Sequence, residues 1–343
     1  MTVSLLLLAL LLPGAILADP RPNIIFFLAD DLGWNDVSFH GSPQIETPNI
    51  DKLADLGITL NNYYVQPICT PSRGALMSGQ YPIHTGLQHD VIAHGQPWGL
   101  PLQISILPQH LKDLGYATHA VGKWHLGFFH PDYTPTKRGF DSHYGYWCGA
   151  EDYVTHVARE PEGEGMDFRS GMDPVKTELG NYSTEIFTRE AVRVVQDHNT
   201  SEPLFLYVAY QSVHSSQGSA PLQAPPKYVD RFPHIQDPKR RMFAGMVAAM
   251  DDSIGAILEA LHSRGLLDNA VVAFSTDNGG PAGGFNLNQA SNWPLRGVKY
   301  SLWEGGTRGS ALVWSPLLSN QGRKSHQLMH VTDWLPTLYS AAG

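Results

Sequence analysis

Apolar runs of strand length alternate along the chain with longer stretches that have a helical period. Asn23–Ala29 is almost continuously apolar and is followed by acidic residues, which is the pattern of a central strand in a parallel sheet. This alternation predicts an α/β fold with a large, mostly parallel mixed sheet that helices flank. The other clear strands are expected at residues 117–121, Leu204–Ala209 and 270–275, and the clearest helices at Ser183–Asp197 and residues 239–263.

Shorter patterns predict further elements between these. Thr47 and Pro48 should open a helix that runs to Asp55, with Gly57 as its natural stop. Residues 72–77 have a short helical pattern, which places Cys69 near the amino end of a helix. We find no persuasive linker or internal repeat, so residues 19–343 are assigned to one domain. A surface loop is expected at residues 159–180, and another irregular connection at residues 215–226.

Residues 1–18 have most features of a secretory signal peptide. Their apolar core at residues 5–12 is broken by a Pro-Gly pair, and Ala18 is a small residue at a suitable cleavage position, although no Lys or Arg precedes the core. The apolar run is too short to span a bilayer, and no later segment is better suited. We therefore expect the secretory pathway and no membrane span, with glycosylation at Asn181 and Asn199.

Composition describes a globular protein with an acidic balance. The 343 residues are 42% hydrophobic and 16% charged, and the formal charge of -9 argues against nucleic acid or an anionic membrane surface as a partner. Protonating all 16 histidines would change this charge to +7 as an upper bound. A polyanionic substrate would then be repelled less at low pH, which favours the lysosome over secretion.

Cys69 lies in the most informative motif of the chain. The two cysteines of a secreted protein, Cys69 and Cys148, could form a disulfide, and an unmodified Cys69 thiolate at a helix terminus is a conceivable nucleophile. Residues 69–73, however, read Cys-Thr-Pro-Ser-Arg. This motif resembles the Cys-x-Pro-Ser-Arg signature of the sulfatase family, in which the cysteine is oxidised to formylglycine. Residues 66–73 together resemble the arylsulfatase B branch, which also contains arylsulfatases I and J.

The resemblance runs from about Asn23 to the end of the chain. It implies the alkaline phosphatase-like α/β sandwich, and we expect the family's smaller C-terminal subdomain to be absent, so that the catalytic domain is truncated relative to the family. Most of the family's cysteines are missing, and residues 215–220 look like an insertion that could reshape the substrate mouth. Further landmarks are residues 28–34, 122–127, 138–141, 292–299, 301–306 and 330–338.

Oxygen-bearing side chains follow two of the expected strands. Asp30 and Asp31 come after the first, and Asp277 and Asn278 come after the strand at residues 270–275. The carboxyl ends of parallel strands meet at one edge, so these groups can converge there, although each pair alone could be a helix cap or a turn. Oxygen ligands favour Ca²⁺ or Mg²⁺ over zinc. The resemblance implies that all four bind one calcium ion, with modified Cys69 as a further ligand.

Basic residues are expected around residue 69. Arg73 can reach back across one helical turn towards the modified side chain. Lys123 and His125 lie two residues apart and would face the same side of an extended loop. The resemblance implies that Arg73 holds the hydrated aldehyde, that Lys123 contacts sulfate, and that His125 holds the nucleophile and assists its proton transfers.

Two more site residues come from the resemblance. His214 matches the family's sulfate-contacting histidine, and we expect it to protonate the leaving oxygen together with Lys299, which also contacts the substrate. Arg296 and Arg308 are expected to be structural or rim charges.

The activity that the resemblance implies is sulfuric ester hydrolysis on sulfated sugars. The expected substrates are N-acetylgalactosamine 4-sulfate units of dermatan and chondroitin sulfate, and the expected maturation partner is the formylglycine-generating enzyme. One hydroxyl of the hydrated aldehyde would attack sulfur, and the other would let the diol collapse and release sulfate. Two alternatives stay open: a phosphatase or phosphodiesterase of the same fold, and an inactive sulfatase-like glycan-binding protein.

Overall fold

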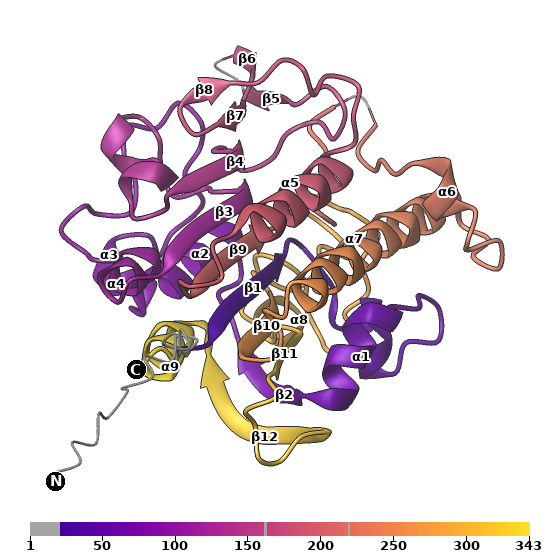
Figure 1. The fold of residues 1–343 in the computed structure, drawn as a ribbon. Coiled ribbons are helices and arrows are strands. Elements are labelled where there is room, and N and C mark those ends of the chain that lie inside the picture. Colours follow the sequence, from indigo (N-terminus) through magenta and orange to yellow (C-terminus); the bar gives the residue numbers. More distant parts are fainter. Residues whose placement is uncertain (1–20, 161–162, 219) are drawn as a thin grey trace, which may run out of the picture.

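A ten-stranded mixed sheet forms the centre of the molecule, in the order β12-β2-β11-β10-β1-β9-β3-β4-β7-β8 (Figure 1). The computed structural model describes residues 21–160, 163–218 and 220–343, so the expected signal peptide lies outside the described residues. The strands are β1 Asn23–Ala29, β2 Ile58–Tyr64, β3 Ala117–Lys123, β4 Ser142–Tyr146, β5 Val157–Glu160, β6 Gly163–Met166, β7 Phe168–Ser170, β8 Asp173–Pro174, β9 Leu204–Ala209, β10 Ala270–Thr276, β11 Ala311–Trp314 and β12 Arg323–His330.

Helices cover this sheet, and several short 3₁₀ turns connect the elements. The α-helices are α1 Pro48–Leu56, α2 Cys69–Ser78, α3 Pro82–Thr85, α4 Leu107–Asp113, α5 Ser183–Asp197, α6 Pro226–Val229, α7 Pro238–Ser263, α8 Glu304–Thr307 and α9 Trp334–Ala341. The 3₁₀ turns are Trp34–Asp36, Ser38–His40, Pro131–Tyr133, Pro135–Lys137 and Val331–Asp333.

The middle of the sheet is parallel, as the continuous apolar runs predict. Strand β1 pairs in parallel with β10 on one side and with β9 on the other, and β3 follows β9 in the same direction. All seven residues of β1 are buried, which is expected for a strand with layers on both faces. The antiparallel pairs, such as β10 with β11 and β4 with β7, lie outside this central group.

Alternate side chains of β1 enter two separate cores. Ile25 and Phe27 belong to the cluster that includes residues of α1, α5 and α7, whereas Phe26 and Leu28 belong to the cluster that includes residues of α2, α4 and α9. Successive side chains of a strand point to opposite faces, so one strand contributes to both layers. Figure 1 shows α5 and α7 lying side by side over one face of the sheet.

One expectation about a segment needs correction. Residues 159–180 are not simply a surface loop: β5 and β6 form a hairpin that begins just before them, and β7 joins the main sheet beside β4. Phe168 of β7 is fully buried against the aromatic rings of Tyr144 and Phe187, and this packing outweighs the polar composition of the segment.

Within residues 21–160, 163–218 and 220–343, no helix combines the length and apolarity that a membrane span requires.

Candidate active site

Four neighbouring parallel strands end at one edge of the sheet, and each delivers predicted site residues there. Asp30 and Asp31 follow β1, and Asp277 and Asn278 follow β10, whose last residue pairs with the last residue of β1. Lys123 is the last residue of β3, and the segment after β9 leads to His214. The convergence expected from parallel topology is therefore observed.

Cys69 is the first residue of α2, and its thiol faces the end of β1. The sulfur lies 3.8 Å from Oδ1 of Asp30, and all ten residues of α2 are buried. The helix amino end offers backbone N–H groups and a favourable dipole for an anion beside residue 69. Burial raises the pKa of the Cys69 thiol to about 12, so the unmodified side chain is a neutral thiol in this environment. Cys148 is also a free, buried thiol, and the disulfide alternative is wrong.

Buried basic side chains form ion pairs with the carboxylates that follow β1 and β10. Lys123 Nζ lies 2.5 Å from Oδ2 of Asp30. Arg73 is fully buried and donates from Nε and Nη2 to Oδ2 of Asp277, at 3.0 and 2.9 Å. Burial alone would raise the pKa of Asp30, but the positive charges of Lys123 and Arg73 hold it below the ordinary value. Arg73 thus contacts the carboxylates of two strands, in addition to any role towards residue 69.

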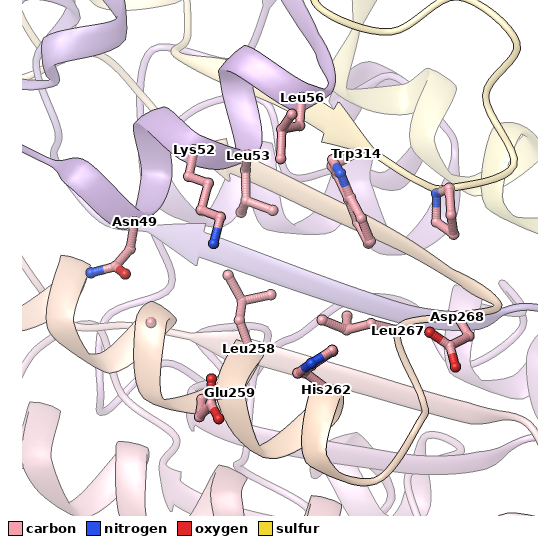
Figure 2. Close-up of a pocket in the computed structure, with 12 residues that line it drawn as sticks. Asn49, Lys52, Leu53, Leu56, Leu258, Glu259, His262, Leu267, Asp268 and Trp314 are labelled. Atoms are coloured by element: carbon pink, nitrogen blue, oxygen red, sulfur yellow. The ribbon is translucent and has the colours of Figure 1, made fainter.

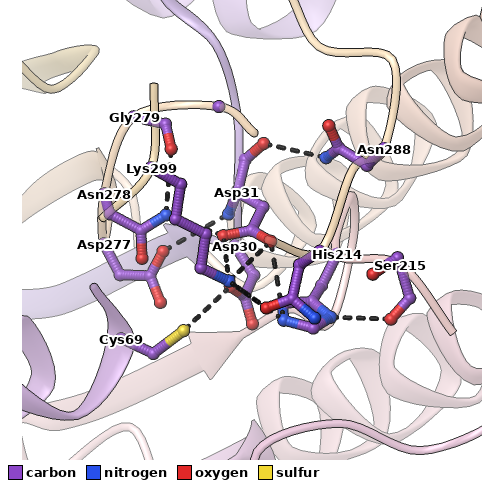
Figure 3. A network of polar contacts seen from close by, with 12 residues as sticks. Asp30, Asp31, Cys69, His214, Ser215, Asp277, Asn278, Gly279, Asn288 and Lys299 are labelled. Carbon is purple, nitrogen blue, oxygen red and sulfur yellow. Dashed lines mark hydrogen bonds and ion pairs between the residues drawn. The ribbon is translucent and has the colours of Figure 1, made fainter. Parts of the chain in front are cut away.

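Asp31, Lys299 and His214 form a second group (Figure 3). Lys299 Nζ lies 2.8 Å from the Asp31 carboxylate and 3.2 Å from Nε2 of His214. His214 Nδ1 lies 2.7 Å from the backbone carbonyl of Ser215, which can only accept, so Nδ1 carries the proton and Nε2 accepts from Lys299. Burial and the Lys299 charge lower the pKa of His214 and keep its imidazole neutral. The expected pairing of His214 with Lys299 is observed.

His125 does not continue an extended segment, contrary to the expectation for this loop. Strand β3 ends at Lys123, and His125 has a left-handed backbone with φ of 58°. Its Nε2 lies 3.1 Å from the carbonyl of Ile92, so Nε2 is the donor, while Nδ1 is buried without a hydrogen-bond partner among the described residues. An unpartnered buried acceptor is costly, and it is suited to a hydroxyl group at residue 69.

The donor set fits a hard divalent cation. Ligand atoms of Asp30, Asp31, Cys69 and His214 all lie within 4.8 Å of one another. Asn278 donates from Nδ2 to Oδ1 of Asp31 at 2.7 Å, whereas its own Oδ1 is buried without a described partner. An orphaned amide oxygen among carboxylates is the type of group that Ca²⁺ and Mg²⁺ bind.

The charge balance of this site is also compatible with the binding of a cation and an anion at the same time. Three buried carboxylates (Asp30, Asp31 and Asp277) face three buried cations (Arg73, Lys123 and Lys299), so the side chains alone are formally balanced. Adding a divalent cation would leave two positive charges, which a sulfate monoester and a deprotonated nucleophile would neutralise.

A cavity of about 70 Å³ opens over residue 69. Cys69, His125, His214 and Lys299 line it, so it brings the expected nucleophile, its partner and the expected acids together. Lys123, Arg73 and Asp277 are buried and are not among the residues that line it. The separate groove between α1 and α7, of about 420 Å³, is lined by none of the predicted site residues and is remote from this chemistry (Figure 2).

Several residues of the site had no signal in the sequence. Asn286 lines the cavity and accepts from Lys299 Nζ at 3.1 Å, and Phe285 places its ring 5.5 Å from the same nitrogen. Asn288 is fully buried and donates to the carbonyls of Asp31 and Val213, which ties two loops of the site together. These residues lie in an irregular segment, and only tertiary contacts show their role.

Comparisons with known proteins agree with this arrangement. A family model described as Sulfatase matches residues 22–343. Arylsulfatase J from Mus musculus is 48% identical over 326 residues, covering 94% of this chain and 52% of the relative. N-acetylgalactosamine-6-sulfatase from Homo sapiens is 34% identical over 346 residues, covering 96% of this chain and 64% of the relative. The chain thus spans between about half and two thirds of the length of these curated relatives.

A solved structure shares the fold at high similarity. The crystal structure of Ps i-CgsB superposes with a TM-score of 0.85 and 36% identity, over 94% of this chain and 72% of that chain. The alkaline phosphatase-like sandwich, with a large mixed sheet flanked by helices, is therefore confirmed.

Proposed function

Because the chain belongs to the sulfatase family, we propose that it is a sulfuric ester hydrolase that acts on sulfated sugars. The observation that carries the proposal is the position of Cys69, at the start of α2 and beside the carboxylate of Asp30, in a cavity that Lys299 and His214 also line. As the bond between sulfur and the sugar oxygen breaks, negative charge develops on the oxygens of a sulfate ester. Fixed positive groups beside these oxygens stabilise that charge.

The substrate that we propose is the N-acetylgalactosamine 4-sulfate unit of dermatan and chondroitin sulfate. The names of two relatives support this class: one is an arylsulfatase, and the other is a sulfatase of the same sugar at its 6-position. The site itself accommodates only the ester group, so the choice between the 4- and 6-positions depends on contacts outside the cavity of about 70 Å³. Defined disaccharides that carry one sulfate at either position would distinguish the two.

One calcium ion is proposed as the cofactor. Asp30, Asp31, Asp277 and Asn278 would hold it, with an oxygen of modified Cys69 as a further ligand. The close group that Asp30, Asp31 and Cys69 form with His214 supports part of this set, as does the orphaned Oδ1 of Asn278, whereas Asp277 lies outside that group. When bound, the ion supplies positive charge that neutralises a sulfate oxygen and favours a deprotonated nucleophile.

The protein's own groups then have separable tasks. Formylglycine at residue 69, when formed, supplies a hydrated aldehyde with one hydroxyl for attack on sulfur and another for release of sulfate. Lys123 and Lys299 bind sulfate oxygens, and the free Nδ1 of His125 accepts a proton from the attacking hydroxyl. Lys299, whose ammonium donates to Nε2 of the neutral His214, delivers a proton to the sugar oxygen as its bond to sulfur breaks, and His214 orients this ammonium.

Maturation and location follow from the same reading. We propose that the formylglycine-generating enzyme oxidises Cys69 in the secretory pathway, before α2 is buried, since every residue of α2 is inaccessible in the folded chain. The lysosome is the proposed destination, and secretion is the alternative. The glycosylation positions Asn181 and Asn199 are both exposed, which is compatible with attached glycans.

Mass spectrometry of the peptide containing residue 69 and a paired hydrolase assay test the proposal. We expect formylglycine at residue 69 of secreted protein and faster hydrolysis of an aryl sulfate than of the matching aryl phosphate. Cys69→Ala is the control and should abolish sulfate release without unfolding the chain.

Each alternative has its own outcome. Faster phosphate hydrolysis would favour the phosphatase or phosphodiesterase. Retention of a sulfated glycan without turnover, by protein that carries formylglycine, would favour the inactive glycan-binding protein. An unmodified thiol in an active preparation would remove the proposed nucleophile.

A further inference from the structure

A groove of about 510 Å³ continues outward from the cavity over residue 69. Val91, Gln217, Phe285 and Asn286 line both the groove and the cavity, so the two are neighbouring parts of one depression. The inner cavity, at about 70 Å³, is too small for a sugar ring in addition to the ester group. The sugar that carries the ester, and the residue linked to it, must therefore lie along the groove.

One wall of the groove is aromatic and polar. Phe285 is 54% exposed, and its ring lies 6.1 Å from that of Tyr300. Tyr300 donates its hydroxyl hydrogen to Asp90, another groove residue, at 3.3 Å. Exposed aromatic faces beside hydrogen-bonding groups suit a sugar ring, which has one apolar face and a polar edge.

Arg159 is the basic residue among those that line the groove. The backbone N–H of Arg159 donates to Oε1 of Gln217 at 2.6 Å, and this bond joins the β5–β6 hairpin to the segment just after His214. Gln217, which lies in the segment expected to reshape the substrate mouth, thus holds the backbone of Arg159 at the groove.

The guanidinium of Arg159 is available to a ligand. Its side chain is 51% exposed, and its Nε lies 2.9 Å from Oε2 of Glu164, whose side chain is 64% exposed. Exposed ion pairs of this kind contribute little to stability and exchange partners readily. A guanidinium can bind a second planar carboxylate with two parallel hydrogen bonds.

We propose that Arg159 determines specificity in an outer subsite, where it binds the carboxylate of the uronic acid next to the sulfated sugar. The inference rests on the proposed function, because that function places the sulfate ester in the inner cavity. In dermatan and chondroitin sulfate, the neighbour of N-acetylgalactosamine is a uronic acid, so a carboxylate enters the groove whenever the ester enters the cavity. Phe285, whose ring lies beside that of Tyr300, contacts the sugar rings, and Arg159 binds the carboxylate.

The test compares two substrates that differ only in the carboxylate. One is a sulfated disaccharide with its uronic acid, and the other is the same disaccharide with the carboxyl reduced to an alcohol. Wild type should prefer the acid, and in Arg159→Gln the ratio of kcat/KM for acid to alcohol should fall about tenfold, through KM. Arg159→Lys should restore part of the ratio, because it keeps the charge but loses the two-pronged geometry.

A matched control and a binding measurement separate the possible failures. Arg193→Gln removes another exposed, ion-paired arginine, on α5, and should leave the ratio unchanged. Calorimetry with the Cys69→Ala chain reports the same acid-to-alcohol preference in affinity without needing turnover. If turnover fails but the affinity preference depends on Arg159, the proposed function falls and the subsite stands. An unchanged ratio in Arg159→Gln overturns the subsite even if sulfate is released.

Discussion

At the scale of single residues, the site combines groups that are individually unfavourable. Asp31 and His125 both have left-handed backbones, with φ of 57° and 58°, and both carry predicted functions. Asn278 and His125 each bury a polar atom without a described partner. Such strain and unsatisfied polarity persist where the surrounding structure imposes them, and they are typical of functional sites.

Gly149 is predicted to control the position of the His125 ring. A Cβ at residue 149 would lie 2.7 Å from Cε1 and 2.8 Å from Nε2 of His125, so Gly149→Ala must displace this ring. We expect kcat/KM for an aryl sulfate to fall by about tenfold to a hundredfold, with a small change in thermal midpoint. Gly165→Ala is the matched control, since a Cβ there meets nothing within 4 Å, and equal activity losses in the two variants would contradict the prediction.

Asn278 should be required for calcium binding. Calcium that binds only the folded chain raises its thermal midpoint, so wild type should be stabilised as calcium is added. Asn278→Ala, which removes the orphaned oxygen, should need about tenfold more calcium for the same shift, whereas Asn278→Asp should keep the response. Calorimetry of the chelated and calcium-loaded forms measures this. An identical calcium response of wild type and Asn278→Ala would exclude Asn278 as a ligand.

At the scale of elements, helix α1 begins where the local sequence predicts, but a distant residue caps its amino end. Thr47 and Pro48 open the helix as predicted, yet the Thr47 side chain makes no capping bond to the helix backbone. The first free N–H groups, of Asn49 and Ile50, donate instead to the carboxylate of Asp251 on α7, at 3.1 and 2.9 Å. Asp251, about two hundred positions away in the sequence, thus caps the amino end of α1 in place of a neighbouring side chain.

Asp251 should make the stability of the α1–α7 contact depend on pH. Burial raises its pKa from 3.8 to about 6, so the folded chain keeps a proton between about pH 4 and 6 that the unfolded chain loses. Its contribution to the unfolding free energy is therefore largest below pH 4 and is lost as the pH rises through 6. The Asp251→Asn side chain cannot ionise, and this variant should be less stable than wild type by about 1–2 kcal/mol at pH 5. At pH 7.5 this gap in the free energy of unfolding should be smaller or reversed.

Urea unfolding of both chains at the two pH values measures this gap. Asp252→Asn is the control, because Asp252 is a neighbouring carboxylate whose side chain is 39% exposed and pairs with Arg231. A gap for Asp251→Asn that does not change with pH would contradict the assigned titration.

At the scale of the whole molecule, folding limits how strongly the charge can respond to acid. The pKa of seven of the 16 histidines is lowered, chiefly by burial, so these seven resist protonation and the upper bound of +7 in formal charge is not reached. These histidines are His40, His119, His125, His143, His198, His214 and His330. Acid should therefore reduce the repulsion of a polyanion without creating a strongly basic surface.

Binding of chondroitin sulfate by the Cys69→Ala chain tests this consequence. Affinity should rise by about threefold to tenfold from pH 7.5 to pH 5 at low ionic strength, and most of the rise should disappear at high salt. Unsulfated hyaluronan, which carries carboxylates alone, is a suitable comparison. Affinity for chondroitin sulfate that is independent of pH and of salt would contradict a role for net charge.

The sequence alone determined the strand-and-helix alternation and identified the motif around residue 69. A continuously apolar strand such as Asn23–Ala29 or Leu204–Ala209 must be covered on both faces. The local sequence therefore suffices to place these strands in the middle of the sheet. The motif at residues 69–73 was equally readable, and the acids after β1 and β10 could be paired because parallel strands share an edge.

Only the tertiary structure decided which partners these residues have. The capping carboxylate of Asp251 and the contact of Asn288 with Asp31 join segments that are remote in sequence. The pairing of β7 with β4 and the contact of Asn286 with Lys299 join nearer segments, but the local pattern did not indicate them either. Hydrophobic periodicity reports how one segment faces the core, but it carries no information on which polar group of another segment will be buried against it. Those pairings depend on the packing of the whole chain, because a buried polar atom must find its partner there.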